Sequence, residues 1–354
     1  MEPRLEGENI GLLPQVSSSP ESFSQQAMPA EPLLKVENLA VSFTTEAGSF
    51  RVVDDVSFTL IAGQTLGLVG ESGCGKSVTA LSLLGLLPKP AGQVVAGQAL
   101  FQGQDLLTLT AEQRYKVRGN KIAMIFQEPM TALNPVHTIG RQLMEVYQLH
   151  KPKMGKREQQ AAAMAMLQQV GIPEAKARLT AYPHQLSGGM RQRVMIAMAL
   201  ACEPDLLICD EPTTALDVTI QAQILHLIKA LQQKNGMAVL FITHDLGVVA
   251  QICDQVLVMY AGRSAEQAPV LSLYERPVHP YTQGLLASIP RLDQPSKTVL
   301  ATIPGQVPSL EEQVSGCRFA NRCAYQTDVC QQQPAVEQVA VGHTVWCHHW
   351  RELA

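Results

Sequence analysis

The sequence has no hydrophobic run long enough to cross a membrane. No apolar stretch approaches the 18 residues that a spanning helix needs, and the longest obvious one, residues 194–202, is typical of a buried helix. The long apolar core of a signal peptide is also missing, because the first residues lead into a stretch rich in Gly, Ser, Pro and Gln. We therefore expect a cytosolic protein with a disordered tail over residues 1–32.

Charge of either sign is sparse as well. Charged residues make up 16% of the 354 residues, hydrophobic residues make up 46%, and the net charge is −4. This composition is typical of a globular chain and gives no electrostatic reason to expect a nucleic-acid partner. A chain of this length predicts about two domains with a sizeable core.

One glycine-rich loop organises the chain. It fits the pattern G-x-x-x-x-G-K-[ST] of nucleoside triphosphate binders and consists of Gly70, Glu71, Ser72, Gly73, Cys74, Gly75, Lys76 and Ser77. A short apolar strand over 64–69 precedes it and an apolar helix over 78–87 follows, which is the context that the motif requires. The loop predicts a polyphosphate site in which Lys76 reaches the β- and γ-phosphates and Ser77 ligates Mg²⁺.

Other strands end at polar residues, where α/β sheets place their ligands. The strand 206–209 ends at Asp210 and Glu211; we expect Asp210 to hold the Mg²⁺ shell and Glu211 to polarise the attacking water. The strand 121–126 ends at Gln127, and the strand 239–242 leads to His244. Residues 130–183 are rich in Ala, Gln, Leu and Met and predict a helical insertion.

Two further strands, 34–43 and 50–58, precede the glycine-rich loop and predict an antiparallel edge added to a parallel core. An aromatic residue in this part could stack on a nucleotide base, and the candidates are Phe50 and Phe43. A second anion-binding loop, with Ser187, Gly188 and Gly189 at a helix start, follows the helical insertion. Two phosphate-binding loops would be redundant unless they serve different sites or different subunits.

The sequence Leu-Ser-Gly-Gly at 186–189, followed by Arg-Gln-Arg, resembles the signature motif of the ATP-binding cassette (ABC) ATPases. The resemblance covers about residues 33–270, with each motif present once and in the family's order. It implies that the signature closes over ATP held by a partner's P-loop, that Asp217 belongs to a loop crossing the dimer interface, and that His244 contacts the γ-phosphate. It also implies that Gln127 senses Mg²⁺ and water. Thr214 stands where the family usually has serine, a conservative difference.

The fold implied by this resemblance is the α/β P-loop fold of the ABC ATPases. Its parts are a RecA-like core with an antiparallel β edge, a helical subdomain at about 130–190, and a small C-terminal extension. The corresponding domains are 33–272 for the ATPase and 273–354 for the extension.

Finer features resemble the dipeptide, oligopeptide and nickel importer subfamily. They are the stretch 126–135 around Gln127, the run 182–185 before the signature, and residues 276–282 in the tail. The resemblance implies an ATPase on the cytosolic face of the inner membrane that energises peptide import. The implied partners are two transmembrane permease subunits, a second ABC ATPase that is either a paralogue or a second copy, and, indirectly, a periplasmic solute-binding protein. Glutathione and nickel remain alternative solutes.

Four of the eight cysteines gather in the tail, at Cys317, Cys323, Cys330 and Cys347. The C-x2-C pairs of zinc sites are absent, and thiolate sets without such pairs can hold an iron–sulfur cluster. The set resembles that of peptide-importer ATPases with a [4Fe–4S] cluster, while free thiols and zinc remain alternatives. Because the nucleotide motifs lie more than a hundred residues upstream, we expect the cluster to be structural and remote from ATP hydrolysis.

A non-transport ABC ATPase of DNA repair or chromosome organisation is the rival from another class. Such proteins carry long coiled coils between the P-loop and the signature. Here about 110 residues separate the two motifs without a sustained heptad pattern, which favours the transport interpretation.

Overall fold

The computed structural model describes residues 31–127, 132–214, 216–290, 301–309, 312 and 314–353. Most of the expected tail at 1–32, part of the stretch 126–135, and Ala215 of the expected interface loop lie outside the described residues. Residues 32–354 form one compact unit. No helix in the described ranges is both long and apolar enough to span a bilayer.

The centre of this unit is a large sheet in which five neighbouring strands are parallel, in the order β9, β3, β8, β7, β6. Their bounds are β3 Thr65–Val69, β6 Ile122–Ile125, β7 Leu206–Asp210, β8 Ala238–Thr243 and β9 Gln255–Tyr260. All residues of β3, β7 and β8 are buried, which explains why these strands are short continuous apolar runs. The carboxyl ends of the strands therefore meet at one edge, where the predicted polar residues follow them.

The strands before the glycine-rich loop do not extend this sheet, so the predicted edge position was wrong. They form a separate antiparallel sheet in the order β2, β1, β4, β5, with bounds β1 Leu34–Thr45, β2 Gly48–Leu60, β4 Gly92–Phe101 and β5 Gln104–Asp105. The physical reason is that β1 is hydrogen-bonded on both sides, to β2 and to β4. The buried face of this sheet packs with α1 (Lys76–Leu83) and with Leu66 and Leu68 of β3 in one apolar cluster.

The antiparallel edge of the large sheet is formed by later parts of the chain. β10 (Arg263–Pro269) pairs with β9, β12 (His343–Val345) pairs with β10, and β11 (Glu337–Ala340) pairs with β12. Two strands of the expected C-terminal extension thus continue the sheet that carries the nucleotide motifs.

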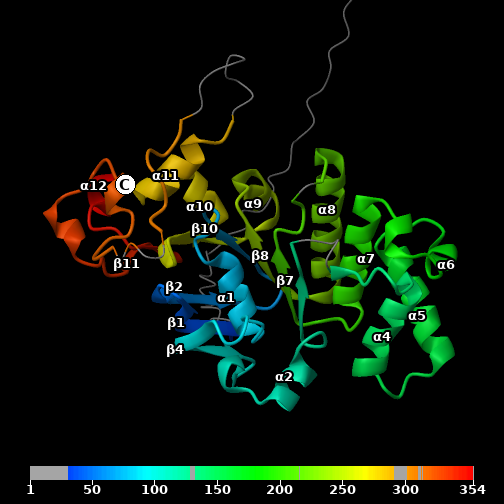
Figure 1. Cartoon of the computed structure of the whole chain (residues 1–354). Helices are drawn as coiled ribbons and strands as arrows, with labels where there is room; N and C mark the ends of the chain where they lie inside the picture. Colours follow the sequence, from blue (N-terminus) through cyan, green and yellow to red (C-terminus); the bar gives the residue numbers. More distant parts are fainter. Residues whose placement is uncertain are drawn as a thin grey trace, which may run out of the picture. The chain divides into compact units, whose positions relative to one another are not determined.

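Helices cover the large sheet and build the predicted helical insertion (Figure 1). The insertion contains α4, α5 and α6; α5 packs with α4, α6 and α7, and α4 also packs with α7. The bounds are α2 Ala111–Val117, α4 Ile139–His150, α5 Lys156–Gln169, α6 Ala175–Arg178, α7 Gly188–Leu200, α8 Val218–Asn235, α9 Leu246–Ile252, α10 Val270–Glu275, α11 Pro280–Ala287 and α12 Trp350–Leu353. Short 3-10 turns occur at Leu106–Thr108, Pro183–Gln185, Ala320–Arg322 and Asp328–Gln331.

Candidate active site

The glycine-rich loop connects β3 to α1, and its glycines are required by the backbone. Gly70 has φ 150° and Gly75 has φ 98°, and a Cβ at Gly70 would lie 2.2 Å from the carbonyl oxygen of Met259. α1 begins at Lys76, two residues earlier than the sequence pattern indicates, so its free N–H groups face the loop. The Lys76 ammonium donates to the carbonyls of Gly70 at 2.7 Å and Glu71 at 2.9 Å. The loop therefore has the form of a phosphate cradle with a buried cation.

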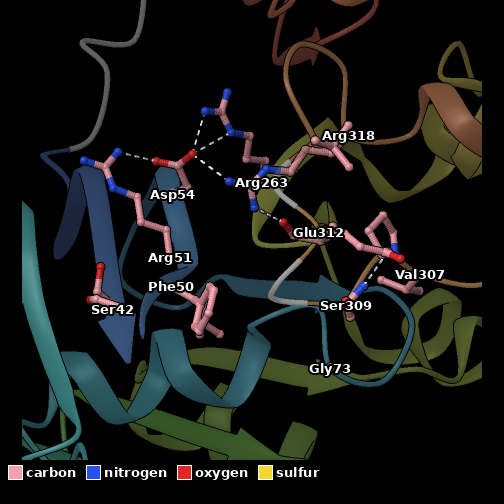
Figure 2. Close-up of a pocket in the computed structure, with 15 residues that line it drawn as sticks. Ser42, Phe50, Arg51, Asp54, Gly73, Arg263, Val307, Ser309, Glu312 and Arg318 are labelled. Atoms are coloured by element: carbon pink, nitrogen blue, oxygen red, sulfur yellow. Dashed lines mark hydrogen bonds and ion pairs between the residues drawn. The ribbon is translucent and has the colours of Figure 1, made fainter. Parts of the chain in front are cut away.

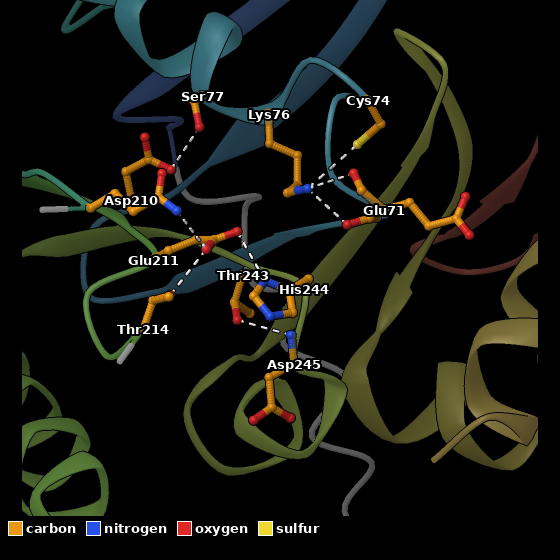
Figure 3. Close-up of polar contacts among 12 residues, drawn as sticks. Glu71, Cys74, Lys76, Ser77, Asp210, Glu211, Thr214, Thr243, His244 and Asp245 are labelled. Carbon is orange, nitrogen blue, oxygen red and sulfur yellow. Dashed lines mark hydrogen bonds and ion pairs between the residues drawn. The ribbon is translucent and has the colours of Figure 1, made fainter. Parts of the chain in front are cut away.

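Ser77 and Asp210 lie together at the start of α1 and the end of β7 (Figure 3). The Ser77 hydroxyl donates to Asp210 Oδ1 at 2.9 Å. Burial raises the pKa of Asp210, and a bound cation would favour its ionised form again. A hydroxyl and a carboxylate fit Mg²⁺, which prefers oxygen ligands and takes the rest of its shell from water and phosphates.

Glu211 follows Asp210 and is the centre of a polar cluster (Figure 3). Its carboxylate accepts hydrogen bonds from Gln127 Nε2 at 3.1 Å and Thr214 Oγ1 at 3.0 Å, and it lies 2.9 Å from His244 Nδ1. Burial acts to raise its pKa, but the bonds with His244 and Thr214 hold the pKa below the usual range. Glu211 therefore remains an ionised carboxylate, as a group that polarises water must be.

The backbone conformation of Glu211 sets the direction of its carboxylate. Glu211 has φ 46°, a conformation that non-glycine residues rarely adopt and that occurs mainly where the surroundings impose it. Its N–H donates to the carbonyl of Ile242 in the neighbouring strand at 2.9 Å. The strand ends predicted from the sequence thus bring Gln127, Asp210, Glu211 and His244 to one place. Thr214, noted in the sequence only as a departure from serine, also binds the carboxylate.

The second predicted anion loop lies at the surface. Ser187 caps α7, and its hydroxyl accepts from the N–H of Met190 at 3.3 Å. Ser187 and Gly188 are exposed, Gly189 is half-buried, and within the described ranges no hydrogen bond joins them to the loop at 70–77. Asp217 is likewise exposed and caps α8 by accepting from Ile220 N–H at 2.9 Å. Within this single chain, these residues do not contribute to the cluster around Glu211.

A cavity of about 500 Å³ adjoins the glycine-rich loop at Gly73 (Figure 2). Phe50 lines it, whereas Phe43 packs against Gly92 of β4, so the cavity favours Phe50 as the base-stacking candidate. The cavity is also lined by tail residues that the sequence analysis did not identify. They are Val307, Pro308, Ser309, Glu312, Val314 and Arg318. No local pattern marks these residues, because they reach the cavity only through the fold.

Asp54, a buried carboxylate of β2, links this cavity to the tail (Figure 2). Three guanidinium groups bind it: Arg51 at 2.9 Å, Arg263 Nε at 2.9 Å and Arg318 at 2.8 Å. Burial acts to raise the pKa of Asp54, but the bonds from Arg263 and Arg51 hold the pKa below its usual range. Arg318 follows Cys317 directly, so one cysteine of the tail is anchored beside the cavity.

The tail also contacts the glycine-rich loop itself. Arg322, which precedes Cys323, forms a bidentate ion pair with Glu71 at 2.6 and 3.1 Å. The hydroxyl of Tyr281 accepts from the Glu71 N–H at 2.9 Å. The expectation that the tail is remote from the nucleotide site rested on sequence separation, and these contacts show that this premise was wrong.

The four tail cysteines line one small cavity, although no group of three or more His, Cys, Asp or Glu in the described ranges has the arrangement of a metal site. Burial raises the pKa of the thiols of Cys317 and Cys323, and that of Cys347 to about 11. The N–H of Tyr325 donates to the Cys323 sulfur at 3.4 Å. The structure therefore brings the thiols of all four tail cysteines, including Cys330, to one cavity.

Comparisons with known proteins agree with this geometry. A family model described as ABC transporter matches residues 53–214, and one described as the C-terminal region of oligopeptide/dipeptide transporters matches residues 265–330. A probable peptide ABC transporter ATP-binding protein of Sinorhizobium fredii is 53% identical over 323 residues, covering 91% of this chain and 96% of that protein. The dipeptide transport ATP-binding protein DppD of Bacillus subtilis is 52% identical over 318 residues, covering 90% and 94%.

The solved structures that resemble this chain include the ATP-binding cassette MJ0796, a dimer in a post-hydrolysis state bound to ADP and phosphate. Its TM-score is 0.60 at 26% identity, covering 67% of this chain and 98% of that one.

Proposed function

This chain belongs to the ABC transporter ATPase family and carries the C-terminal region of oligopeptide/dipeptide transporters, and we propose that it energises peptide import. Hydrolysis of ATP is its reaction. The observation that carries this assignment is the cluster in which Gln127, Thr214 and His244 surround an ionised Glu211 beside the Ser77–Asp210 pair.

Each of these residues has a separate role in the reaction. Lys76 and the N–H groups at the start of α1 bind the phosphates, and Ser77 and Asp210, with Gln127, would hold Mg²⁺. The ion would neutralise charge that develops on the γ-phosphate. Glu211 orients and polarises the attacking water, and His244, which lies against it, contacts the γ-phosphate.

The site is completed by a second ATPase subunit. Ser187, Gly188 and Gly189 stand at an exposed helix start, and among the described residues no hydrogen bond joins them to the chain's own phosphate loop, which suits donation to ATP on a partner. Asp217 is exposed beside Val218, whose side chain is 84% exposed, as expected of residues that a partner covers. The related cassette MJ0796 is known as a dimer. The partner is a paralogue or a second copy of this chain.

An apolar groove of about 580 Å³ provides the site for a transmembrane permease subunit. It lies between α2, β6 and the helices α4 and α7, and its exposed apolar residues are Tyr115, Phe126 and Leu149. Phe126 directly precedes Gln127, which binds Glu211, so a permease segment in the groove would be linked to the hydrolytic carboxylate by one residue. Two permease subunits would hold the ATPase pair at the cytosolic face of the inner membrane. A periplasmic solute-binding protein would deliver the peptide.

Reconstitution tests this function. The chain is purified with the permease and ATPase subunits encoded beside it and placed in liposomes with the neighbouring solute-binding protein. We expect peptide-loaded binding protein to stimulate ATP hydrolysis and labelled peptide to enter the liposomes. Stimulation by nickel or by glutathione alone would replace the peptide assignment, and ATP hydrolysis that responds to no solute would contradict the transport function.

We also propose that Cys317, Cys323, Cys330 and Cys347 bind one [4Fe–4S] cluster. Support comes from their shared cavity and from the Tyr325 N–H donated to the Cys323 sulfur, the kind of bond that tunes cluster thiolates. The raised thiol pKa values mean that ligation must displace protons.

Anaerobically purified protein should contain iron and acid-labile sulfide in equal amounts and show broad visible absorption that bleaches with dithionite. Colourless anaerobic protein with one zinc per chain would refute the cluster, and metal-free protein with four titratable tail thiols would establish free cysteines. A Cys323→Ser/Cys330→Ser double variant should lose the absorption and destabilise the tail. Because Arg322 adjoins Cys323, we expect this variant to weaken ATP binding as well.

A further inference from the structure

The tail residue Arg322 occupies a site where three parts of the chain meet. Its side chain is 4% exposed, and its guanidinium makes five hydrogen bonds. Nε donates to the Pro304 carbonyl at 2.9 Å, and Nη2 donates to the Ile303 carbonyl at 3.2 Å. The other bonds go to Tyr260 of β9 at 3.4 Å and to both carboxylate oxygens of Glu71. All five N–H donors of the Arg322 guanidinium are therefore hydrogen-bonded, so its partners fix its orientation.

Glu71 is held at its backbone as well as at its side chain. The Tyr281 hydroxyl accepts the Glu71 N–H at 2.9 Å, and the Tyr281 ring is fully buried. Phe319, between the first two tail cysteines, packs against the rings of Tyr281 and Tyr260 at centroid distances of 5.4 and 5.1 Å. Phe319 of the cysteine segment therefore packs against Tyr281, the same residue that hydrogen-bonds to Glu71 of the phosphate loop.

The contact reaches the phosphate-binding lysine through one residue. The carbonyl of Glu71 accepts from the Lys76 ammonium at 2.9 Å, so moving Glu71 moves a direct partner of Lys76. A shift of the loop also changes the direction of its N–H groups, on which the fit to a polyphosphate depends.

We propose that Arg322 and Tyr281 are positioning residues of the nucleotide site, which hold Glu71 so that the cysteine-bearing tail sets the affinity for ATP. The inference rests on the nucleotide site proposed above. It does not depend on which species the cysteines bind, because the contacts are made by Arg322, Tyr281 and Glu71 themselves.

The first test measures Mg-ATP binding by the full-length chain. Arg322→Gln removes the bidentate ion pair and should weaken binding about ten-fold or more, because hydrogen bonds between charged groups are among the strongest polar contacts. Arg322→Lys should recover little, since an ammonium cannot reproduce the planar fork. The matched control is Arg351→Gln, which breaks an exposed tail ion pair with Glu337 that touches no loop residue, and it should bind ATP normally.

Glu71→Gln approaches the same contact from the loop and leaves every tail residue intact. It should weaken binding like Arg322→Gln, and the double variant should be little worse than either single one, as expected for residues that act as a unit. If Arg322→Gln unfolds the tail, the ATP affinity of Glu71→Gln alone decides whether the inference holds. In the assembled transporter, KM for ATP should rise more than kcat falls, because the cluster around Glu211 is untouched.

Reciprocity supplies a readout other than activity. ATP should increase hydrogen-exchange protection of the segment 317–330 in the original chain, and this effect should be lost in Arg322→Gln. Unchanged ATP affinity in both Arg322→Gln and Glu71→Gln would overturn the inference. So would an equal loss in Arg351→Gln, which would mean that any disturbance of the tail weakens binding. Failure of the original chain to bind ATP would instead refute the nucleotide site.

Discussion

Replacement of Glu211 by glutamine tests the central assignment of the site with the smallest change of shape. The amide oxygen can still accept from Gln127 and Thr214, and the amide nitrogen can donate to His244 Nδ1 in place of the carboxylate contact. The fold and the unusual φ of 46° should therefore persist. What is lost is the negative charge that we propose polarises water.

The size of the effect follows from that role. Removing a positioned general base costs about 10²- to 10⁴-fold in rate, which corresponds to roughly 3–5 kcal/mol in the barrier. ATP affinity should stay within about three-fold, because the contacts that bind ground state and transition state alike are unchanged. We therefore expect Glu211→Gln to bind ATP, to lose hydrolysis and to accumulate as a closed dimer.

The assay is phosphate release by the fully assembled transporter, with ATP binding and dimer formation measured on the same preparations. Glu203→Gln is the matched control, since Glu203 also has a positive φ, of 53°, but is exposed and lies outside the cluster. The control should hydrolyse ATP at the original rate. Turnover by Glu211→Gln within a few-fold of the original would show that another group activates the water.

Three further outcomes test other parts of the site. Lys76→Ala should weaken ATP binding itself, at least ten-fold, because it removes a charge held against the phosphates; ATP affinity near the original value, measured by calorimetry, would contradict this. Ser187→Arg should block hydrolysis at the site built on the partner's phosphate loop and leave ATP affinity of the isolated chain little changed, so loss of binding by the monomer would argue against a site shared between subunits. Burial acts to raise the pKa of Glu211, but its bonds with His244 and Thr214 hold the pKa below the usual range, so this carboxylate should stay ionised wherever an ordinary glutamate is; an infrared difference against Glu211→Gln that shows it titrating near neutrality would refute this.

The nucleotide motifs were predictable because their chemistry is local. The loop at 70–77 needs glycines for positive φ, a helix start directly after it, and a lysine and a serine at fixed positions, all of which are visible in eight residues. Apolar runs that end in Gln127, in Asp210 and Glu211, or before His244 predict strand ends. Parallel strands then bring those ends to one edge, so a one-dimensional pattern was sufficient to place these residues together.

The pairing of the first two strands was not predictable in this way. Alternation shows that β1 and β2 have a buried face, but it does not show which strand binds the free edge of β1. That partner is β4, which follows the phosphate loop and its helix, and the resulting sheet packs over α1 instead of joining the core.

The role of the tail was decided by tertiary structure alone. Arg322 and Glu71 are 251 positions apart, and an arginine beside a cysteine has no feature in the sequence that marks it as a buried ion-pair partner of the phosphate loop. The sequence determines which residues can bind ATP, because that chemistry is written in short motifs. Only the fold determines that the cysteine segment lies against these motifs. Its position depends on the pairing of β12 with β10 and on the packing of Phe319 against Tyr260 and Tyr281.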